Sequence, residues 1–175
     1  ELASFSSRGP TAIDFNAKPD ILASGVGTVS TASPGSTLYS QYPQYLLAGS
    51  FPTASAPYFV LSGTSQAAPV VSGTIALMLQ ANPNLTPNLV KAILQYTAQE
   101  YEGYRPLEQG AGFLNALGAV RLAQFFVDAK PGDRVPVETI WSGHIIWGNY
   151  EVSGGLILTS GNAWDLGVDW GSSRS

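Results

Sequence analysis

Hydrophobic and polar positions alternate differently in three zones of the chain. Residues 1–33 carry the short apolar stretches "DILAS" and "VGTVSTA" between glycine, proline and serine, a pattern typical of short strands joined by tight turns. Residues 59–123 follow a helical pattern after a short apolar strand, "YFVLS". From residue 128 onward the apolar stretches are again short and are separated by glycine. The pattern predicts strands towards both ends of the chain and helices between them.

The first helix of the central zone is predicted over Gln66 to Ala81. Its apolar residues occupy almost every face, which is the pattern of a helix buried on all sides. Pro69 is tolerated in the first turn of a helix, where its missing N–H is not needed, so the helix should start at or near Ser65.

Two further helices have clear start signals. In residues 84–98 we expect Thr86 to be the N-cap and Pro87 the first helical residue. In residues 110–126, Asn115 is the expected cap of a third, short helix.

Residues 34–58 and the C-terminal zone lack helical periodicity. Residues 34–58 carry four prolines and four tyrosines without a clear period, which predicts a long surface loop. This loop either shapes access to a site or is an insertion without a role. Towards the C-terminus, two tryptophan pairs with the same six-residue separation, Trp141 with Trp147 and Trp164 with Trp170, predict a small β extension.

The composition narrows the possible functions. The chain of 175 residues is 45% hydrophobic and only 11% charged, with a net charge of −4 and no basic cluster, so we set nucleic-acid binding aside. The absence of cysteine excludes disulfides, thiolate catalysis and cysteine-bound zinc. No apolar run is long enough to span a membrane, and no group of histidine and acidic residues has metal-ligand spacing. We therefore expect no membrane span, metal or other cofactor.

The stretch "LSGTSQAAPVVSG", residues 61–73, offers candidate chemistry. Ser65 lies where the helix begins, next to unpaired backbone N–H groups and the positive end of the helix dipole. This geometry stabilises the oxyanion that forms when a hydroxyl attacks a carbonyl. Gly63 permits a sharp turn and a close approach of a substrate chain. A serine at this position also serves as an ordinary helix cap, and spacing alone does not separate the two roles.

Several motifs resemble the subtilisin-like serine peptidases, or subtilases. "SGTSQAAPVVSG" is similar to the family's G-T-S-x-A-x-P motif around the nucleophile, and "ASFSSRGP" (residues 3–10) resembles a strand and turn of that family. "KPDILASG" (18–25) resembles K-P-D-I-x-A-P-G, with Ser24 in place of proline. "NPNLTPNLVKAIL" and "GAGFLNALGAV" resemble the two helices and the glycine turn that close the domain. The order of these motifs agrees over residues 3–123.

The resemblance implies a fold and a domain organisation. The fold would be α/β, the C-terminal half of a subtilisin-like, doubly wound parallel sheet with a buried central helix, followed by a small β-rich extension. Residues 1–125 would form this part of the catalytic domain, 126–138 a linker, and 139–175 the tryptophan- and glycine-rich extension.

The resemblance also implies the function of a serine endopeptidase. Ser65 would form the acyl-enzyme, its own N–H would supply half of the oxyanion hole, and Gly63 and Thr64 would line the substrate pocket. The family's catalytic Asp and His and its oxyanion Asn belong to segments before "ASFSSRGP", so we expect the chain alone to be inactive.

His144, the single histidine, lies outside the resemblance and is expected to be structural. Asp20 is expected to support a turn. Val70 replaces a histidine that is frequent in the family, at a position that only packs.

The resemblance also implies which partners to expect. An N-terminal fragment of the same precursor, or another chain, should cover the exposed sheet edge, and a peptide is the expected substrate. Secretion is implied by the resemblance only. Two alternatives remain open: an assembly protein that uses the subtilase half as a scaffold and the tryptophan-rich tail as a contact surface, and a carbohydrate-binding role for that tail.

Overall fold

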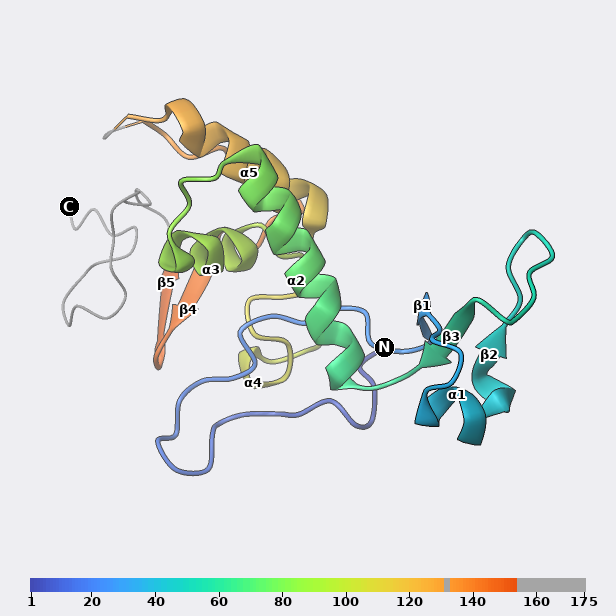
Figure 1. The fold of residues 1–175 in the computed structure, drawn as a ribbon. Coiled ribbons are helices and arrows are strands. Elements are labelled where there is room, and N and C mark those ends of the chain that lie inside the picture. The colour runs from blue at the N-terminus through green and yellow to red at the C-terminus, as the bar shows by residue number, and fades with distance from the viewer. Residues whose placement is uncertain (131–132, 154–175) are drawn as a thin grey trace. The chain divides into compact units, whose positions relative to one another are not determined.

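The computed structural model describes residues 1–130 and 133–153. The chain folds into two compact units, and each is described by itself (Figure 1). Unit 1 comprises Glu1–Ser6 and Ser24–Val70, and unit 2 comprises Ser7–Ala23 and Val71–Ser175.

Unit 1 is built around a three-stranded antiparallel sheet. Its strands are β1 (Thr28–Thr31), β2 (Leu46–Leu47) and β3 (Tyr58–Leu61), in the order β1-β3-β2. Thr28 pairs with Leu61 at one end of the β1–β3 ladder, and Thr31 pairs with Tyr58 at the other. The strands expected within "VGTVSTA" and "YFVLS" are therefore confirmed.

The segment between β1 and β3 is more ordered than the expected long loop. It contains the helix α1 (Thr37–Gln41), the 3-10 turn η1 (Pro43–Tyr45) and strand β2. The Ser36 hydroxyl accepts a hydrogen bond from the Tyr39 N–H at 3.2 Å and so caps α1. The prediction of one continuous loop was wrong because it rested on missing periodicity, and elements this short present none.

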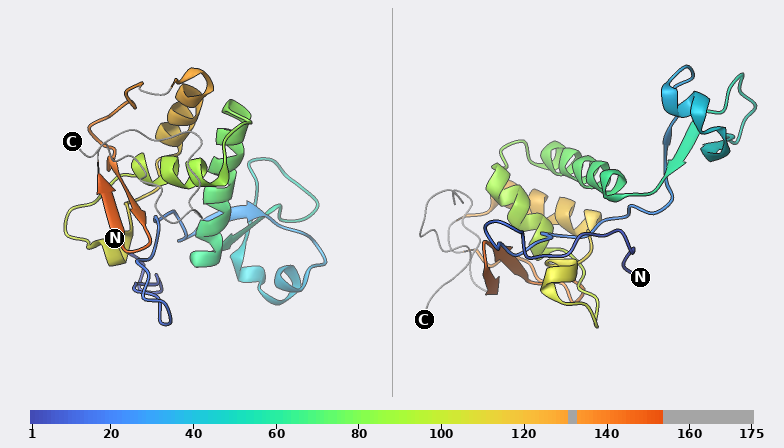
Figure 2. Two further views of the ribbon diagram at one scale, coloured as in Figure 1. Left: turned by 90° about the vertical axis from the view of Figure 1, so that its left-hand side faces the viewer. Right: turned by 90° about the horizontal axis from the view of Figure 1, so that it is seen from below.

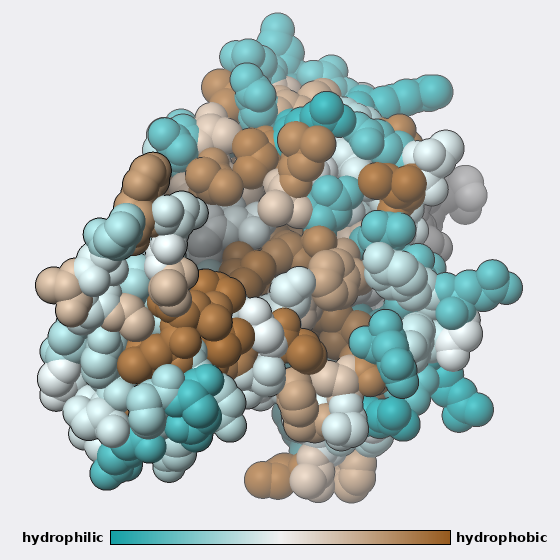
Figure 3. Space-filling view, turned by 90° about the vertical axis from the view of Figure 1, so that its right-hand side faces the viewer, coloured by the Kyte–Doolittle hydropathy of each residue, from teal (hydrophilic) through white to brown (hydrophobic). Residues whose placement is uncertain are grey.

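Helix α2 (Thr64–Ala81) begins one residue before the position that the sequence indicated. Pro69 is its sixth residue rather than a first-turn residue, so the carbonyl of Ser65 lacks the N–H that would normally bond to it. Among the residues of α2, only Thr74 and Met78 are buried, whereas Leu77 and Leu79 are 51% and 40% exposed. This differs from the helix buried on all sides that its composition suggested. Figure 3 shows several hydrophobic patches on one face of the molecule.

The core of unit 2 is formed by two helices whose starts were both predicted. In α3 (Pro87–Tyr96), the Thr86 hydroxyl accepts from the Leu89 N–H at 3.2 Å, and in α5 (Ala116–Asp128), the Asn115 side chain accepts from the Gly118 N–H at 2.9 Å. Figure 2 shows α3 and α5 from two further sides. Their buried residues, among them Leu89, Ile93, Leu122 and Phe126, form one cluster with Met78 of α2 and with Trp141.

Residues 110–112, which directly follow the short helix α4 (Pro106–Gln109), form a turn that we call the glycine turn. It holds distant backbone segments of unit 2 together. The Leu22 N–H donates to the Gly112 carbonyl at 2.8 Å, and Phe113 exchanges two backbone hydrogen bonds with Gln99. A Cβ on Gly112 would lie 2.5 Å from the carbonyl oxygen of Gln99, and its φ of 126° also favours glycine. The predicted motifs "KPDILASG" and "GAGFLNALGAV" therefore contact each other directly.

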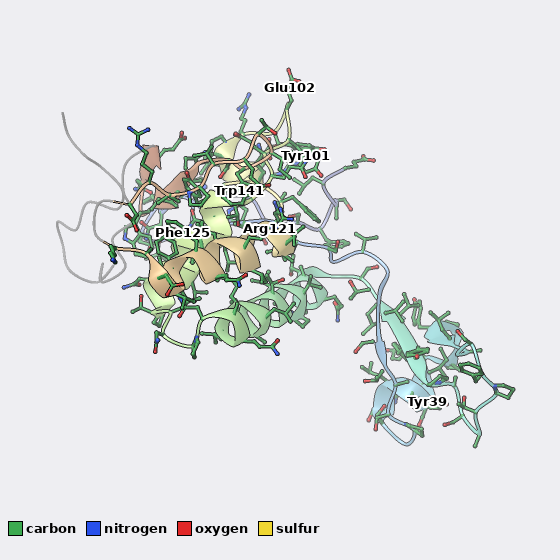
Figure 4. All side chains as sticks on the ribbon, turned by 90° about the horizontal axis from the view of Figure 1, so that it is seen from above. Tyr39, Tyr101, Glu102, Arg121, Phe125 and Trp141 are labelled. Atoms are coloured by element: carbon green, nitrogen blue, oxygen red, sulfur yellow. The ribbon has the colours of Figure 1, made fainter. Side chains whose placement is uncertain are left out.

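An antiparallel hairpin occupies the start of the predicted extension. Its strands are β4 (His144–Trp147) and β5 (Tyr150–Ser153), joined by a two-residue loop in which Gly148 has a φ of 59°. Trp141, labelled in Figure 4, is buried. Its ring contacts that of Tyr96 in α3 edge-on, with 6.1 Å between the ring centroids. Trp164 and Trp170 lie outside the described residues.

The α/β class that the sequence implied is confirmed, but the arrangement of strands differs from a parallel sheet. Every pairing between named strands in the described residues is antiparallel, and the parallel pairing found there is the bridge between Leu22 and Phe113. The reason is local: "DILAS" finds a single backbone partner, the glycine turn, and so forms a bridge rather than a strand. The boundaries at residues 125 and 138 stay a prediction; α5 ends at Asp128.

Candidate active site at the start of helix α2

Ser65 is the second residue of α2 and lies on the surface of unit 1. Within the residues that the structure describes, neither its hydroxyl nor its backbone N–H is engaged in a hydrogen bond. The preceding residue, Thr64, is exposed as well. The hydroxyl is thus free to react, and the N–H points out of a helix end, where the macrodipole places partial positive charge.

Gly63 holds the backbone in the turn that leads into Ser65. Its φ of 155° is one that side-chain-bearing residues rarely adopt. Its carbonyl accepts hydrogen bonds from the N–H groups of Gln66 at 3.0 Å and Ala67 at 3.3 Å, which closes the first turn of the helix. The position of Ser65 is therefore fixed by backbone interactions on both sides.

Gly25 supports this turn from a distant part of the sequence. The Gly63 N–H donates to the Gly25 carbonyl at 2.7 Å. A Cβ on Gly25 would lie 2.6 Å from the Gly63 carbonyl oxygen and 3.1 Å from the Cβ of Ala67, so the two backbones touch. The Ser62 hydroxyl adds a further link by accepting from the Gly27 N–H at 2.9 Å.

Sequence reasoning placed Ser65, Gly63 and Thr64 together but missed the support from Gly25 and Ser62. Gly25 was part of a quoted motif, "KPDILASG", and a glycine inside such a motif signals close backbone approach. Nothing in the sequence indicated which segment would approach it.

The arrangement at Ser65 can perform part of an acyl-transfer reaction. An exposed hydroxyl and an unpaired N–H at a helix start can attack a carbonyl and stabilise the resulting oxyanion. A serine hydroxyl also needs a general base within hydrogen-bond reach, and that base needs a group to orient it. Unit 1 contains no histidine, since the single histidine of the chain belongs to unit 2.

His144 is a buried residue of β4. Its Nδ1 lies 3.3 Å from the carbonyl oxygen of Ser142, and its backbone N–H donates to the Ser142 hydroxyl at 3.5 Å. These contacts are local, and they agree with the structural role that the sequence suggested for this histidine.

Asp20 is part of a small ion-pair cluster in unit 2. Its carboxylate lies 2.5 Å from the Lys18 Nζ and 2.8 Å from the Lys91 Nζ, and Lys91 also lies over the Trp147 ring, 4.6 Å from its centroid. Burial by itself would raise the pKa of Asp20, but the hydrogen bonds and charges of the two lysines outweigh it, so the pKa is lowered. Asp20 therefore stays ionised and braces the segment that precedes the glycine turn.

This cluster predicts a specific loss of stability in acid. Because the folded-state pKa of Asp20 is lowered, its stabilising contribution is present above the unfolded-state pKa of about 3.9 and is lost as the pH falls through the folded-state value. Urea unfolding from pH 7 to pH 2.5 should show this loss, at most about 1 kcal/mol for a partly exposed pair. In Asp20→Asn it should be missing, whereas Glu102→Gln, at an exposed loop position (Figure 4), should keep it. An Asp20→Asn variant with the wild-type pH profile would contradict the assignment.

Neither a metal site nor a membrane-spanning helix was found in the described residues. Within 1–130 and 133–153, no group of three histidine or acidic residues is placed to hold a metal ion. In the same residues, no helix has both the length and the hydrophobicity needed to cross a bilayer.

Comparisons with known proteins agree on one family. Residues 1–119 match the Subtilase family. Over 119 residues the chain is 44% identical to "Serine protease AprX" of Bacillus subtilis. The match covers 68% of this chain and 25% of that protein. Over 152 residues it is 30% identical to "Pyrolysin" of Pyrococcus furiosus, covering 81% of this chain and 9% of that protein.

A similar solved structure is fervidolysin of Fervidobacterium pennivorans, described as a keratinolytic enzyme related to subtilisin. It is 25% identical, with a TM-score of 0.44, and the match covers 69% of this chain and 16% of that one. This chain therefore spans a quarter or less of the length of these relatives.

Proposed function

The chain belongs to the subtilase family, and we propose that it is the part of a serine endopeptidase that supplies the nucleophile. Ser65 attacks the scissile carbonyl, the peptide C–N bond breaks, and the amine fragment leaves with the proton taken from the serine; water then hydrolyses the acyl ester and restores the Ser65 hydroxyl. The observation that carries the proposal is an exposed serine with a free hydroxyl at the start of α2, inside a sequence that matches the family. Gly63 and Thr64 line the place where the peptide lies.

The missing parts of the reaction come from outside this chain. We propose that an N-terminal segment of the same precursor supplies the histidine base, the aspartate that orients it and the asparagine that completes the oxyanion hole. Deprotonation of the Ser65 hydroxyl requires a general base. We do not assign that role to His144, because it is buried and its Nδ1 contacts the carbonyl oxygen of Ser142. Without this segment the chain is inactive.

The apolar surface of unit 2 supports a covering partner. A cavity of about 730 Å³ opens there between α2, α3 and the segment 18–21. Its apolar lining includes Ile21, Ile75, Val90 and Leu94. Exposure of an apolar cavity of this size to water is unfavourable, so a partner should cover it. We propose the N-terminal segment as this partner, because the same segment would supply the missing catalytic residues. Since the resemblance also implies secretion, we place the assembled enzyme outside the cell.

Labelling with a fluorophosphonate probe tests the proposed function. The native sample is treated with the probe, and every polypeptide is then measured by denaturing intact-mass analysis. We expect the probe mass on this chain at Ser65, accompanied by a second segment that carries histidine and aspartate. An unlabelled chain in the presence of that segment would contradict the role of Ser65. A Ser72→Ala variant, which removes a hydroxyl from the exposed side of the same helix, should label like the wild type.

A further inference from the structure

Strand β1 lies at an open edge of the sheet in unit 1. Within the residues that the structure describes, β3 pairs with one side of β1 and no strand pairs with the other (Figure 1). The Ala32 N–H donates to the Pro57 carbonyl at 2.8 Å and continues the β1–β3 ladder. Because hydrogen bonding alternates along an antiparallel ladder, the N–H and C=O groups of Val29 and Thr31 point away from β3. No described residue outside the sheet forms a backbone hydrogen bond with them.

The same two residues belong to an exposed apolar face of the sheet. Val29 lies opposite Val60 of β3. Tyr58 lies between Thr31 on one side and Leu47 of β2 on the other. Residues that are directly opposite each other, or two apart in one strand, share a face. On this face Val29 is 53% exposed, Tyr58 40% and Leu47 39%, so much of its apolar surface is in contact with water.

The edge also lacks the features that usually prevent strands of two molecules from pairing. Soluble proteins protect edge strands with charged side chains, proline or a β-bulge. Strand β1 has the sequence TVST, and its register with β3 runs without a bulge. No acidic residue, lysine, arginine or histidine occurs from residue 21 to residue 90, and Glu1 is the single charged residue of unit 1. Two identical edges can therefore approach each other without repulsion between like charges.

We propose that β1 pairs with β1 of a second copy of this chain and that this contact forms a homodimer. Antiparallel pairing around a two-fold axis at Ser30 places Val29 of one protomer opposite the partner's Thr31. The backbone groups that point away from β3 then bond to one another, and the exposed faces of the two sheets become continuous.

The edge fits its own copy because the two residues with free backbone groups are each other's partners in this arrangement. The contact is small, so we expect a weak dimer that depends on protein concentration. The inference goes beyond the proposed function, since it does not involve the reaction at Ser65.

A single introduced cysteine tests the geometry, because the chain contains none of its own. In Ser30→Cys the two thiols would lie at the two-fold axis, in a pair of residues that is not hydrogen-bonded. The Cα atoms of such a pair are about 4.5 Å apart, within the range of roughly 4.4–6.8 Å that a disulfide spans. Oxidation by glutathione disulfide should link Ser30→Cys into a dimer. Ser50→Cys, at an exposed position between β2 and β3, is the matched control and should stay largely unlinked.

Two results of the cross-linking experiment would overturn the proposal. The first is a Ser30→Cys protein that forms no more dimer than Ser50→Cys. The second is a dimer of the chain alone that disappears when the N-terminal segment is bound, because that segment would then occupy the edge in the assembled protein.

Sedimentation velocity over a range of protein concentrations tests association without a cross-link. The wild-type protein should form a dimer as its concentration rises. Val29→Lys brings like charges together across the contact and should raise the dimer Kd about tenfold or more. Val26→Lys makes the same chemical change at a 67% exposed position before the strand and should dimerise like the wild type. Urea unfolding of both variants shows that a loss of pairing is not a loss of the fold. A wild-type protein that is monomeric throughout, or equal Kd values for the two variants, would contradict the homodimer.

Discussion

Replacing Ser65 by alanine should lower kcat of the assembled peptidase by about 10⁶-fold, a magnitude carried over from subtilisin, a member of the same family. The reason is that the acyl-enzyme cannot form without the hydroxyl, while the backbone N–H that we propose as an oxyanion donor remains. The measurement is hydrolysis of a chromogenic peptide by the assembled protein, with Ser72→Ala as the control of equal chemical change.

The same variant should leave the fold almost untouched. Ser65 is exposed, and its hydroxyl makes no hydrogen bond to a described residue, so the free energy of unfolding should change by less than about 0.5 kcal/mol. Activity and stability are thereby separated within one substitution. A Ser65→Ala protein that retains more than a percent of the wild-type rate would remove Ser65 from the role of nucleophile.

Replacing Gly25 by alanine should have the second largest effect, although Gly25 touches no reacting atom. The added methyl group would lie 2.6 Å from the Gly63 carbonyl oxygen, which is backbone and cannot turn aside like a side chain. The backbone at Gly63 must then move, and Ser65 moves with it. We expect kcat to fall about 100-fold, because misplacement of a reacting group by about 1 Å costs this much. The strain should also lower the free energy of unfolding by about 1–3 kcal/mol.

Gly73→Ala provides the matched control for Gly25→Ala. Gly73 lies in the same helix, α2, and a Cβ there would meet no atom within 4 Å. This substitution should raise the free energy of unfolding by up to about 1 kcal/mol, because alanine is the better helix former. The rate of fluorophosphonate labelling and urea unfolding are measured on both variants. Gly25→Ala that labels as fast as Gly73→Ala would show that the Gly25 contact does not position Ser65.

The sequence by itself determined the features that depend on residues close together in the chain. Thr86 and Asn115 were identified as helix caps, and the strand before Gly63 and the start of α2 were located to within a residue. The caps and the helix start depend on hydrogen bonds between residues at most four positions apart, so the local sequence contains both partners. The motif around Ser65 identified the family for the same reason, since it is contiguous. The strand was located by its apolar run alone, and its pairing with β1 was not predicted.

Only the tertiary structure decided which distant segments meet. The contact between Gly25 and Gly63, the meeting of Leu22 with the glycine turn and the cavity of unit 2 between α2, α3 and the segment 18–21 join residues far apart in the chain. The exposure of α2 was likewise not readable, because an apolar face is buried only if a neighbour covers it. Such contacts depend on the path of the whole backbone and on packing at every intervening position. The order of residues along the chain shows which side chains are apolar, but only the tertiary structure shows which side chains they contact.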